Sequence, residues 1–404
     1  MGTGNLSVPV ERVVFRQQLR AWDARLRLAG ELCAKNGGSV MRYMDTGTVA
    51  RDLEQLSSVI SGPNTPINYW GFSGGSIIGS YWVNMFPHRV GRVILDGNGN
   101  PEEWAHSQFS EWTSNSMVDS MKAFRNFAKA CAEAGAQRCA LARKESTPES
   151  IEADIDSLIA HLEVRPLPVL NTSFPDIVTS QHIKLLLWQA AFAPATWPNV
   201  ATLLAAAISG DGSGIITSLS SVELDTTVPA SARFVFDQVM CMDAPALSPH
   251  EASVAVDKLE EAVYFASWRM KACHAWQVRG KYRFDGPFNH TLRNPILVIG
   301  NTPVTPLRNA MRVHELLGNS SRLLIQDSTG HCSISTVSLC TTNAIRGYLL
   351  DGNLPQNGLL CSPSETPFPA LDRQEMEDFT SDDMRFLQVA KNLRHTWEHN
   401  PLYL

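Results

Sequence analysis

Between residues 67 and 86 the sequence passes from an apolar strand pattern through a glycine-rich turn into a helical pattern. The strand is predicted over Ile67–Phe72 and the helix over residues 76–86. The same alternation returns near the C-terminus, with strands predicted at residues 295–300 and 322–326 around a helix at Leu307–Leu317. Because an intervening helix returns the chain across the sheet, such strands pair in parallel. The sequence therefore predicts an α/β fold with a parallel sheet.

Residues 101–287 differ from both flanks, because long helical patterns rich in Ala, Leu and Trp prevail there and strand signals are scarce. One more strand, at residues 92–96, precedes this region. We therefore expect a helical insertion (101–287) between an N-terminal part of the core (1–100) and a C-terminal part (288–404). Further helices are predicted at residues 10–34, 49–60 and 341–350, and an extended tail with one terminal helix is predicted after Cys361.

Composition and motifs argue against nucleic acid, a membrane span, a metal and a cofactor. With 34 basic and 40 acidic side chains, the net charge of -6 leaves no positive surplus for binding nucleic acid. The 44% hydrophobic and 18% charged residues are typical of a globular chain with a large core. No stretch approaches the roughly 18 apolar residues of a membrane span. Neither a metal nor a cofactor is expected, since no Cys-x-x-Cys pair or comparable motif is present.

The turn at residues 71–75, Gly-Phe-Ser-Gly-Gly, fits the pattern Gly-x-Ser-x-Gly. Between a strand and a helix, this pattern exposes the serine oxygen above the sheet, and its glycines avoid collisions that larger residues would make. Ser73 is therefore a candidate nucleophile. The N–H of Gly74, at the start of the helix, is a candidate oxyanion donor. An ordinary glycine-rich turn is the alternative.

A serine nucleophile needs a base, and His331 follows the last strong strand signal, where the chain order Ser, acid, His places the histidine. Of the 11 histidines, those at 88, 314 and 395 lie in helical or surface-like segments. His331 lies on a loop past a strand end and is the candidate general base. A core or capping role for His331 is the alternative.

These motifs and their surroundings resemble the α/β-hydrolases of the tripeptidyl and prolyl aminopeptidase type, with a C-terminal region typical of the tripeptidyl branch. The similar stretches are residues 67–75, 86–104, 295–307 and 326–355. The resemblance implies an α/β-hydrolase core with a helical lid, Ser73 as nucleophile and His331 as base. It also implies that six of the eight cysteines form disulfides, with the pairs Cys131–Cys139, Cys241–Cys273 and Cys340–Cys361.

The compartment stays open at this point. The cysteines, together with glycosylation sequons at Asn5, Asn171, Asn289 and Asn319, favour a secreted glycoprotein. The opening segment shows no basic stretch followed by an apolar run, which favours the cytoplasm if Met1 is the true start.

One departure from the family pattern concerns the acid. Relatives carry an aspartate in the loop after the seventh strand, whereas here residues 300–302 run directly into Pro303. Asp96 and Asp327 are the nearby candidates for a surrogate acid, although we favour a structural role for each. The loss of such an acid can cost about 10⁴ in turnover.

A second departure concerns the start of the chain. Residues 1–7 resemble a turn that follows the fourth strand in the family, so we expect the first four strands and their oxyanion loop to be absent. The strand Ile67–Phe72 then becomes an edge strand with unpaired backbone groups. Self-association or a missing segment is expected to cover this edge, or the chain is a fragment.

Three functions remain open. The leading one is a serine hydrolase that cleaves an amide or ester through an acyl-Ser73 intermediate, with peptides that have a free amino terminus as the implied substrates. The second is an enzyme of specialised (secondary) metabolism that acts on an ester, lactone or thioester, or that uses His331 as a base in cyclisation or elimination. The third is a non-catalytic homologue. Tryptophans in or near the lid either line an apolar pocket or pack its helices: Trp104, Trp112, Trp188, Trp197, Trp268 and Trp276.

Overall fold

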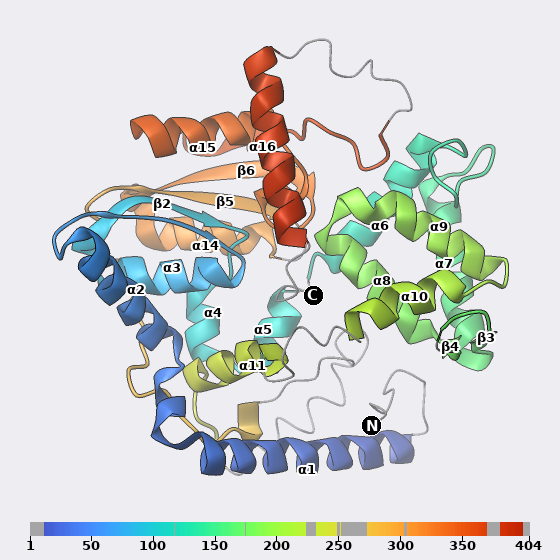
Figure 1. Ribbon diagram of the computed structural model, residues 1–404, viewed down its shortest axis with the longest axis horizontal. Helices are drawn as coiled ribbons and strands as arrows, with labels where there is room; N and C mark the ends of the chain where they lie inside the picture. The colour runs from blue at the N-terminus through green and yellow to red at the C-terminus, as the bar shows by residue number, and fades with distance from the viewer. Residues whose placement is uncertain are drawn as a thin grey trace.

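The structure is a computed structural model that describes residues 12–116, 118–173, 175–223, 232–248, 251, 273–302, 305–369 and 380–398 (Figure 1). Its helices and strands are α1 (Arg12–Gly37), α2 (Thr46–Ser61), β1 (Ile67–Phe72), α3 (Gly74–Met85), β2 (Val90–Asp96), α4 (Pro101–His106), α5 (Phe109–Ser116), α6 (Ser120–Ala134), α7 (Pro148–Val164), β3 (Leu167–Val169), β4 (Asp176–Val178), α8 (Ser180–Phe192), α9 (Trp197–Ile208), α10 (Ser213–Glu223), α11 (Ala232–Asp243), β5 (Ile296–Thr302), α14 (Leu307–Leu317), β6 (Ser321–Thr329), α15 (Leu339–Asp351), β7 (Leu359–Cys361) and α16 (Ser381–Glu398).

The central sheet has five strands in the order β1-β2-β5-β6-β7, and every neighbouring pair is parallel. This confirms the predicted parallel α/β sheet. It also confirms that β1 lies at an edge of the sheet in the described part of the chain. β7 and the antiparallel pair β3–β4 were not predicted, because strands of three residues are too short to show a period of two.

Helices cover both faces of the sheet. α3 and α14 lie below it in Figure 1, and α15 lies above it. Strand residues alternate between these two layers: Leu95 and Val298 join the cluster that contains α3 and α14 residues, whereas Ile94 and Leu297 pack with Tyr348 of α15. Adjacent residues point to opposite faces of a strand, so one strand supplies both hydrophobic cores.

The helices between β2 and β5 form two groups. α4, α5 and α11 lie against the core, where Trp104 and Met240 join its main hydrophobic cluster. Helices α6 to α10, which we call the helical lobe, enclose a separate cluster that includes Ile155 and Leu204 (Figure 1). Phe368, from the tail after β7, also packs in this lobe. The tail therefore ties the lobe to the end of the sheet.

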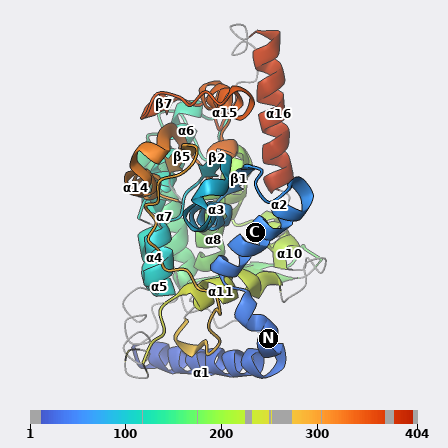
Figure 2. The same cartoon turned by 90° about the vertical axis from the view of Figure 1, so that its left-hand side faces the viewer.

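The N-terminal helix α1 lies below the rest of the molecule (Figures 1 and 2). It contacts the 3-10 turn at Cys273–Ala275, where His274 Nε2 lies 2.5 Å from a carboxylate oxygen of Asp23. Two aspects of the helical predictions are confirmed here: a long helix near the start of the chain and a single terminal helix, α16. Within the described ranges no helix is both long and apolar enough to cross a membrane.

Three disulfides are present, and they are the three predicted pairs. Cys131–Cys139 closes a short loop after α6. Cys241–Cys273 joins the end of α11 to the 3-10 turn, and Cys340–Cys361 joins α15 to β7. Cys33 and Cys332 have free thiols. Asn171, Asn289 and Asn319 of the sequons are exposed, while Asn5 lies outside the described residues.

Candidate active site

Ser73 occupies the turn between β1 and α3 in a conformation that non-glycine residues rarely adopt. Its φ is 53° and its ψ is -118°. Such a backbone costs of the order of 1–3 kcal/mol and persists only where the surroundings hold it. The N–H of Ser73 donates to the carbonyl oxygen of Asp96 at 2.9 Å. A Cβ on Gly71 would lie 2.4 Å from the carbonyl oxygen of Gly75, so the turn requires glycine there.

The helix α3 begins immediately after Ser73. Gly74 is its first residue, and the N–H groups of a first helical turn have no acceptor within the helix. Ser76 fixes this turn, because its hydroxyl donates to the carbonyl of Ser73 at 2.6 Å and accepts from the N–H of Gly99 at 3.1 Å. The N-terminus of α3 carries a partial positive charge that favours an anion beside it. Gly74 therefore lies where its N–H meets the conditions expected of an oxyanion donor.

His331 lies on the loop that follows β6 and is only 3% exposed. Its backbone N–H donates to the carbonyl of Phe192, at the end of α8, at 2.9 Å. The rings of His331 and Phe192 meet edge to face, with their centroids 5.1 Å apart. Thr305 Oγ1 lies 3.5 Å from Nδ1 of the imidazole. Burial lowers the pKa of His331 to about 4, because the protonated ring loses its hydration. The ring is therefore neutral at pH 7 and able to accept a proton.

The turn of Ser73 and the loop of His331 are in contact. Cys332 Sγ lies 3.6 Å from the carbonyl oxygen of Asp96, the same atom that accepts from the N–H of Ser73. A Cβ on Gly97, which follows β2, would lie 2.4 Å from Cys332 Sγ, so the segment after Asp96 passes too close to the His331 loop for any side chain at this position. The fold thus places the two residues predicted as nucleophile and base at the ends of neighbouring loops.

Asp96, one candidate for the surrogate acid, is completely buried at the end of β2. Its carboxylate accepts from the N–H of Ser333 at 2.8 Å and from the hydroxyl of Ser333 at 2.5 Å. Burial raises its pKa from 3.8 to about 6, and the bonds from Ser333 oppose this shift. Asp96 therefore holds the loop two residues beyond His331.

Asp327, the other candidate, points to the exposed side of β6. It lines a cavity of about 290 Å³ between β6, the helical lobe and the tail, together with Asn126, Trp197 and Thr336. The aspartate of relatives would lie near residues 303–304, which are outside the described residues. Thr305 follows directly and reaches the imidazole.

Sequence reasoning missed the residues that hold the His331 loop from other elements. Asn301 Nδ2 donates to the carbonyls of Gly330 at 3.2 Å and Cys332 at 2.9 Å. Asn301 could have been found from the sequence, because it lies just before the loop in which relatives carry the catalytic aspartate. Phe192 had none, because only the fold brings the end of α8 to this loop.

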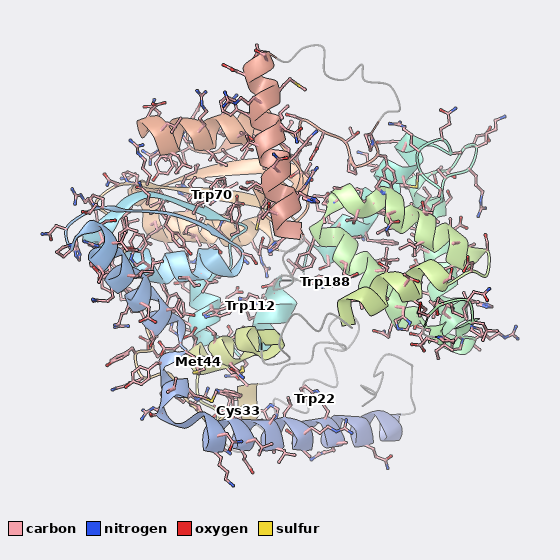
Figure 3. The ribbon with its side chains drawn as sticks, in the orientation of Figure 1. Trp22, Cys33, Met44, Trp70, Trp112 and Trp188 are labelled. Atoms are coloured by element: carbon pink, nitrogen blue, oxygen red, sulfur yellow. A yellow bond between two sulfur atoms is a disulfide. The ribbon has the colours of Figure 1, made fainter. Side chains whose placement is uncertain are left out.

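The tryptophans serve mainly to pack helices. Trp104 and Trp197 are buried, and their indole N–H groups donate to Asp243 and to the carbonyl of Ala190. Trp188 is half-buried and meets Phe192 edge to face at 4.9 Å, where the helical lobe meets the core (Figure 3). Trp188 thus begins a series of ring contacts that continues through Phe192 to His331. Trp268 is outside the described residues.

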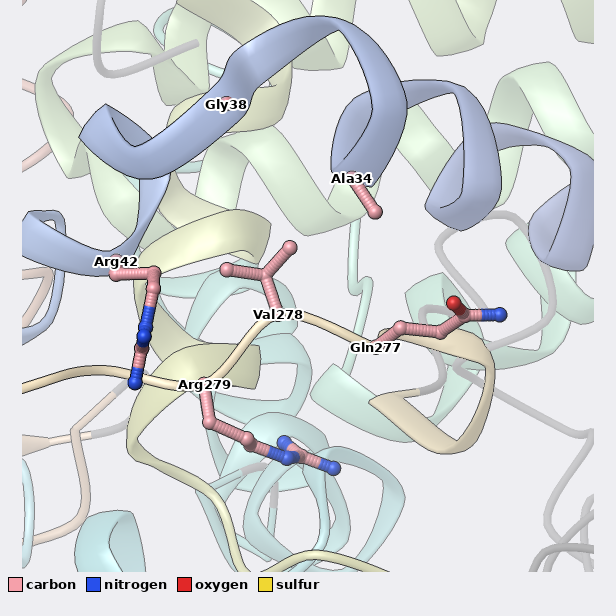
Figure 4. A pocket seen from close by; sticks show the side chains of 6 residues that line it. All are labelled: Ala34, Gly38, Arg42, Gln277, Val278 and Arg279. Atoms are coloured by element: carbon pink, nitrogen blue, oxygen red, sulfur yellow. The ribbon is translucent and has the colours of Figure 1, made fainter.

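A second cavity, of about 350 Å³, lies away from this site between α1 and the segment before β5 (Figure 4). It is lined by Ala34, Gly38, Arg42, Gln277, Val278 and Arg279. The guanidinium of Arg279 donates to the carbonyl of Cys241 at 2.6 Å. Among the described residues, no group of three or more His, Cys, Asp or Glu side chains is placed to hold a metal ion.

The sequence is similar to those of known peptidases. Residues 261–361 match the family model described as TAP-like protein. The chain is 23% identical over 360 residues to the tripeptidyl aminopeptidases of Streptomyces lividans and Streptomyces coelicolor, an alignment that covers 87% of this chain and 64% of each relative. It is also 23% identical over 365 residues to serine protease Hip1 of Mycobacterium tuberculosis, with 83% of this chain and 65% of the relative covered.

The chain is a distant homologue of these serine peptidases. Its fold is an α/β-hydrolase core with helical insertions. The chain spans 64% of the length of the tripeptidyl aminopeptidases that it matches.

Proposed function

We propose that the protein is a serine hydrolase that cleaves an amide bond of peptides with a free amino terminus through an acyl-Ser73 intermediate. The observation that carries this proposal is the shared carbonyl of Asp96, which accepts from the N–H of Ser73 and lies 3.6 Å from Cys332 Sγ. It holds the strained serine turn against the loop that carries His331. The choice of a peptide substrate rests on the similarity to the tripeptidyl aminopeptidases, whose name states that they act on peptides from the amino terminus.

The reaction follows from the residues in their proposed roles. Ser73 Oγ attacks the substrate carbonyl while His331 accepts the hydroxyl proton. The N–H of Gly74 stabilises the resulting oxyanion at the N-terminus of α3. When the carbon–nitrogen bond breaks, protonated His331 gives its proton to the departing amine. Water then attacks the acyl-serine while His331 takes its proton. The bond between the acyl carbon and Ser73 Oγ breaks, His331 returns the proton to Oγ, and the acid is released.

Burial of His331 has two opposing consequences for this reaction. Its lowered pKa keeps the ring unprotonated at neutral pH, so the base is fully available. A base of low pKa is also a weak one, because proton transfer is most efficient when the pKa is near the working pH. The surroundings of the loop must therefore orient the ring well for the enzyme to be active.

A fluorophosphonate probe tests the nucleophile directly. We expect stoichiometric labelling of the wild-type protein, no labelling of Ser73→Ala, and labelling of His331→Ala that is slower by at least about 10²-fold, the range of a lost general base. Exposed residues provide matched controls, since Ser61→Ala and His88→Ala should label at the wild-type rate. A folded wild-type protein that does not label would instead support a non-catalytic homologue.

The substrate class needs a separate measurement on the same variants. Tripeptidyl 4-nitroanilides with a free and with an acetylated amino terminus should be compared with a 4-nitrophenyl ester. Faster turnover of the free tripeptidyl anilide is expected. Labelling by the probe combined with turnover of the ester alone would retain the serine hydrolase and reject the peptidase.

A further inference from the structure

The residues on either side of His331 have an unusual backbone conformation. Gly330 has φ of 125° and Cys332 has φ of 66°, so both neighbours of His331 have positive φ. For Cys332 this conformation is strained and depends on restraint by the surroundings. The orientation of the imidazole therefore depends on the contacts that hold Gly330 and Cys332.

Asn301 holds both of them. Its side chain is 1% exposed near the end of β5. The amide nitrogen Nδ2 donates to the carbonyl of Gly330 at 3.2 Å and to the carbonyl of Cys332 at 2.9 Å. Ser335 Oγ also donates to the carbonyl of Cys332, at 2.9 Å, from within the same loop. Asn301 thus ties the loop to β5 both before and after His331.

Contacts from α8, β2 and β6 hold this loop at other atoms. The carbonyl of Phe192 accepts the N–H of His331, and Asp96 accepts from Ser333. Cys332 Sγ also meets the carbonyl of Asp96, and Gln326 Nε2 donates to the carbonyls of Ser333 and Thr336. These contacts act on the N–H of His331 or on residues after it. The two bonds from Asn301 act on both sides of the pair His331–Cys332, because they hold the peptide that joins Gly330 to His331 and the peptide that joins Cys332 to Ser333.

One atom of the Asn301 amide has an unfavourable environment. Its Oδ1 is buried and has no hydrogen-bond partner in the described residues. An aliphatic side chain of similar size would avoid this unpaired acceptor. The donor half of the amide is therefore the part that the site uses.

We propose that Asn301 is a positioning residue that orients His331 by holding the carbonyls of Gly330 and Cys332. As a statement about catalysis this rests on the proposed function, in which His331 is the base. As a statement about the loop it is independent of that function. Asn301 acts through the backbone of His331 and does not itself touch the reacting atoms.

The chain offers a closely matched control, Asn98. This side chain is also 1% exposed, its amide nitrogen donates to the carbonyls of Leu95 at 3.1 Å and Ile299 at 2.8 Å, and its Oδ1 is likewise unpaired in the described residues. Asn98→Asp and Asn301→Asp therefore make the same change of volume and charge. They differ in which two carbonyls lose their donor.

The decisive measurement is the rate of fluorophosphonate labelling per folded molecule. We expect Asn301→Asp to slow labelling about 10- to 100-fold, the range that a small misplacement of a catalytic group produces. Asn98→Asp should stay within about threefold of wild type, on the scale of a substitution that changes no catalytic group. In a His331→Ala background, Asn301→Asp should have no further effect, because the two residues act as a unit. Equal labelling rates for Asn301→Asp and wild type would overturn the proposal.

Hydrogen–deuterium exchange provides a readout that needs no activity. Exchange across residues 328–336 should increase in Asn301→Asp and not in Asn98→Asp. If the wild-type protein does not label, the proposed function fails, and this exchange comparison alone decides whether Asn301 holds the loop. Should Asn301→Asp not fold, Asn301→Ala gives the same two measurements without the added charge. Unchanged exchange in the folded Asn301 variant would also overturn the proposal.

Discussion

At the scale of single residues, burial sets the chemistry of the site. His331 is enclosed by Phe192, by Thr305 and by the loop itself, and loss of hydration is the cause of its lowered pKa. A desolvated imidazole resists protonation. In the unfolded chain the ring has the ordinary value of 6.5, so the protonation states of the two forms differ between pH 6.5 and 4.

This difference predicts the pH dependence of labelling. The rate of Ser73 modification should be flat from pH 8 to about 5 and should fall near pH 4, where His331 is protonated in the folded protein. Because the unfolded chain binds this proton first, the contribution of His331 to stability is lost as the pH falls from 6.5 towards 4. Circular dichroism at each pH separates loss of fold from loss of the base. A midpoint near 6.5 in folded protein would contradict the prediction.

At the scale of elements, the ends of β2 and β5 hold the loop that follows β6. Asp96 ends β2 and binds Ser333, and Asn301, near the end of β5, binds Gly330 and Cys332. The carboxyl ends of parallel strands lie at one edge of a sheet, which is why polar residues from distant segments meet there. The strands β2 and β5 are neighbours in the sheet, although the entire helical lobe separates them in the chain.

This arrangement predicts that Asp96 serves as a loop anchor. Asn in its place keeps an acceptor for the N–H of Ser333, so Asp96→Asn should label no more than about tenfold more slowly, against about 10⁴ for the loss of a triad acid. Because the pKa of Asp96 is raised to about 6 in the folded protein, ionisation of this buried carboxyl lowers the free energy of unfolding of the wild type as the pH rises from 4 through 6. Relative to wild type, the free energy of unfolding of the variant should therefore rise over this window, by up to about 3 kcal/mol. Loss of labelling by orders of magnitude would instead make Asp96 a surrogate acid.

At the scale of the whole molecule, the helical lobe and the sheet with its covering helices meet at the site. The helical lobe has its own cluster, and it meets the core where Phe192 accepts the N–H of His331. Disulfides stabilise segments at three places, in the lobe, at α11 and at α15. Cross-links of this kind stabilise a fold mainly by restricting its unfolded state.

The disulfides predict a simple count of thiols. Denatured, unreduced protein should contain two free thiols, from Cys33 and Cys332, and reduction should raise the number to eight. In the native protein only Cys33 should react quickly, because Cys332 is fully buried. The variant Cys33→Ser should abolish the rapid phase. Eight thiols without reduction would show that the pairs are not formed in the protein as isolated.

The sequence by itself determined the parallel α/β sheet, the strand–turn–helix at Ser73 and the three cysteine pairs. These features depend on local periodicity, on glycines near a tight turn and, for the cysteines, on resemblance to a family. The tertiary structure decided which residues surround His331. Asn301 and Phe192 reach its loop from β5 and α8, and the low pKa of its ring results from burial. Contacts between segments and loss of hydration depend on how the chain packs, so they leave no periodic pattern in the sequence.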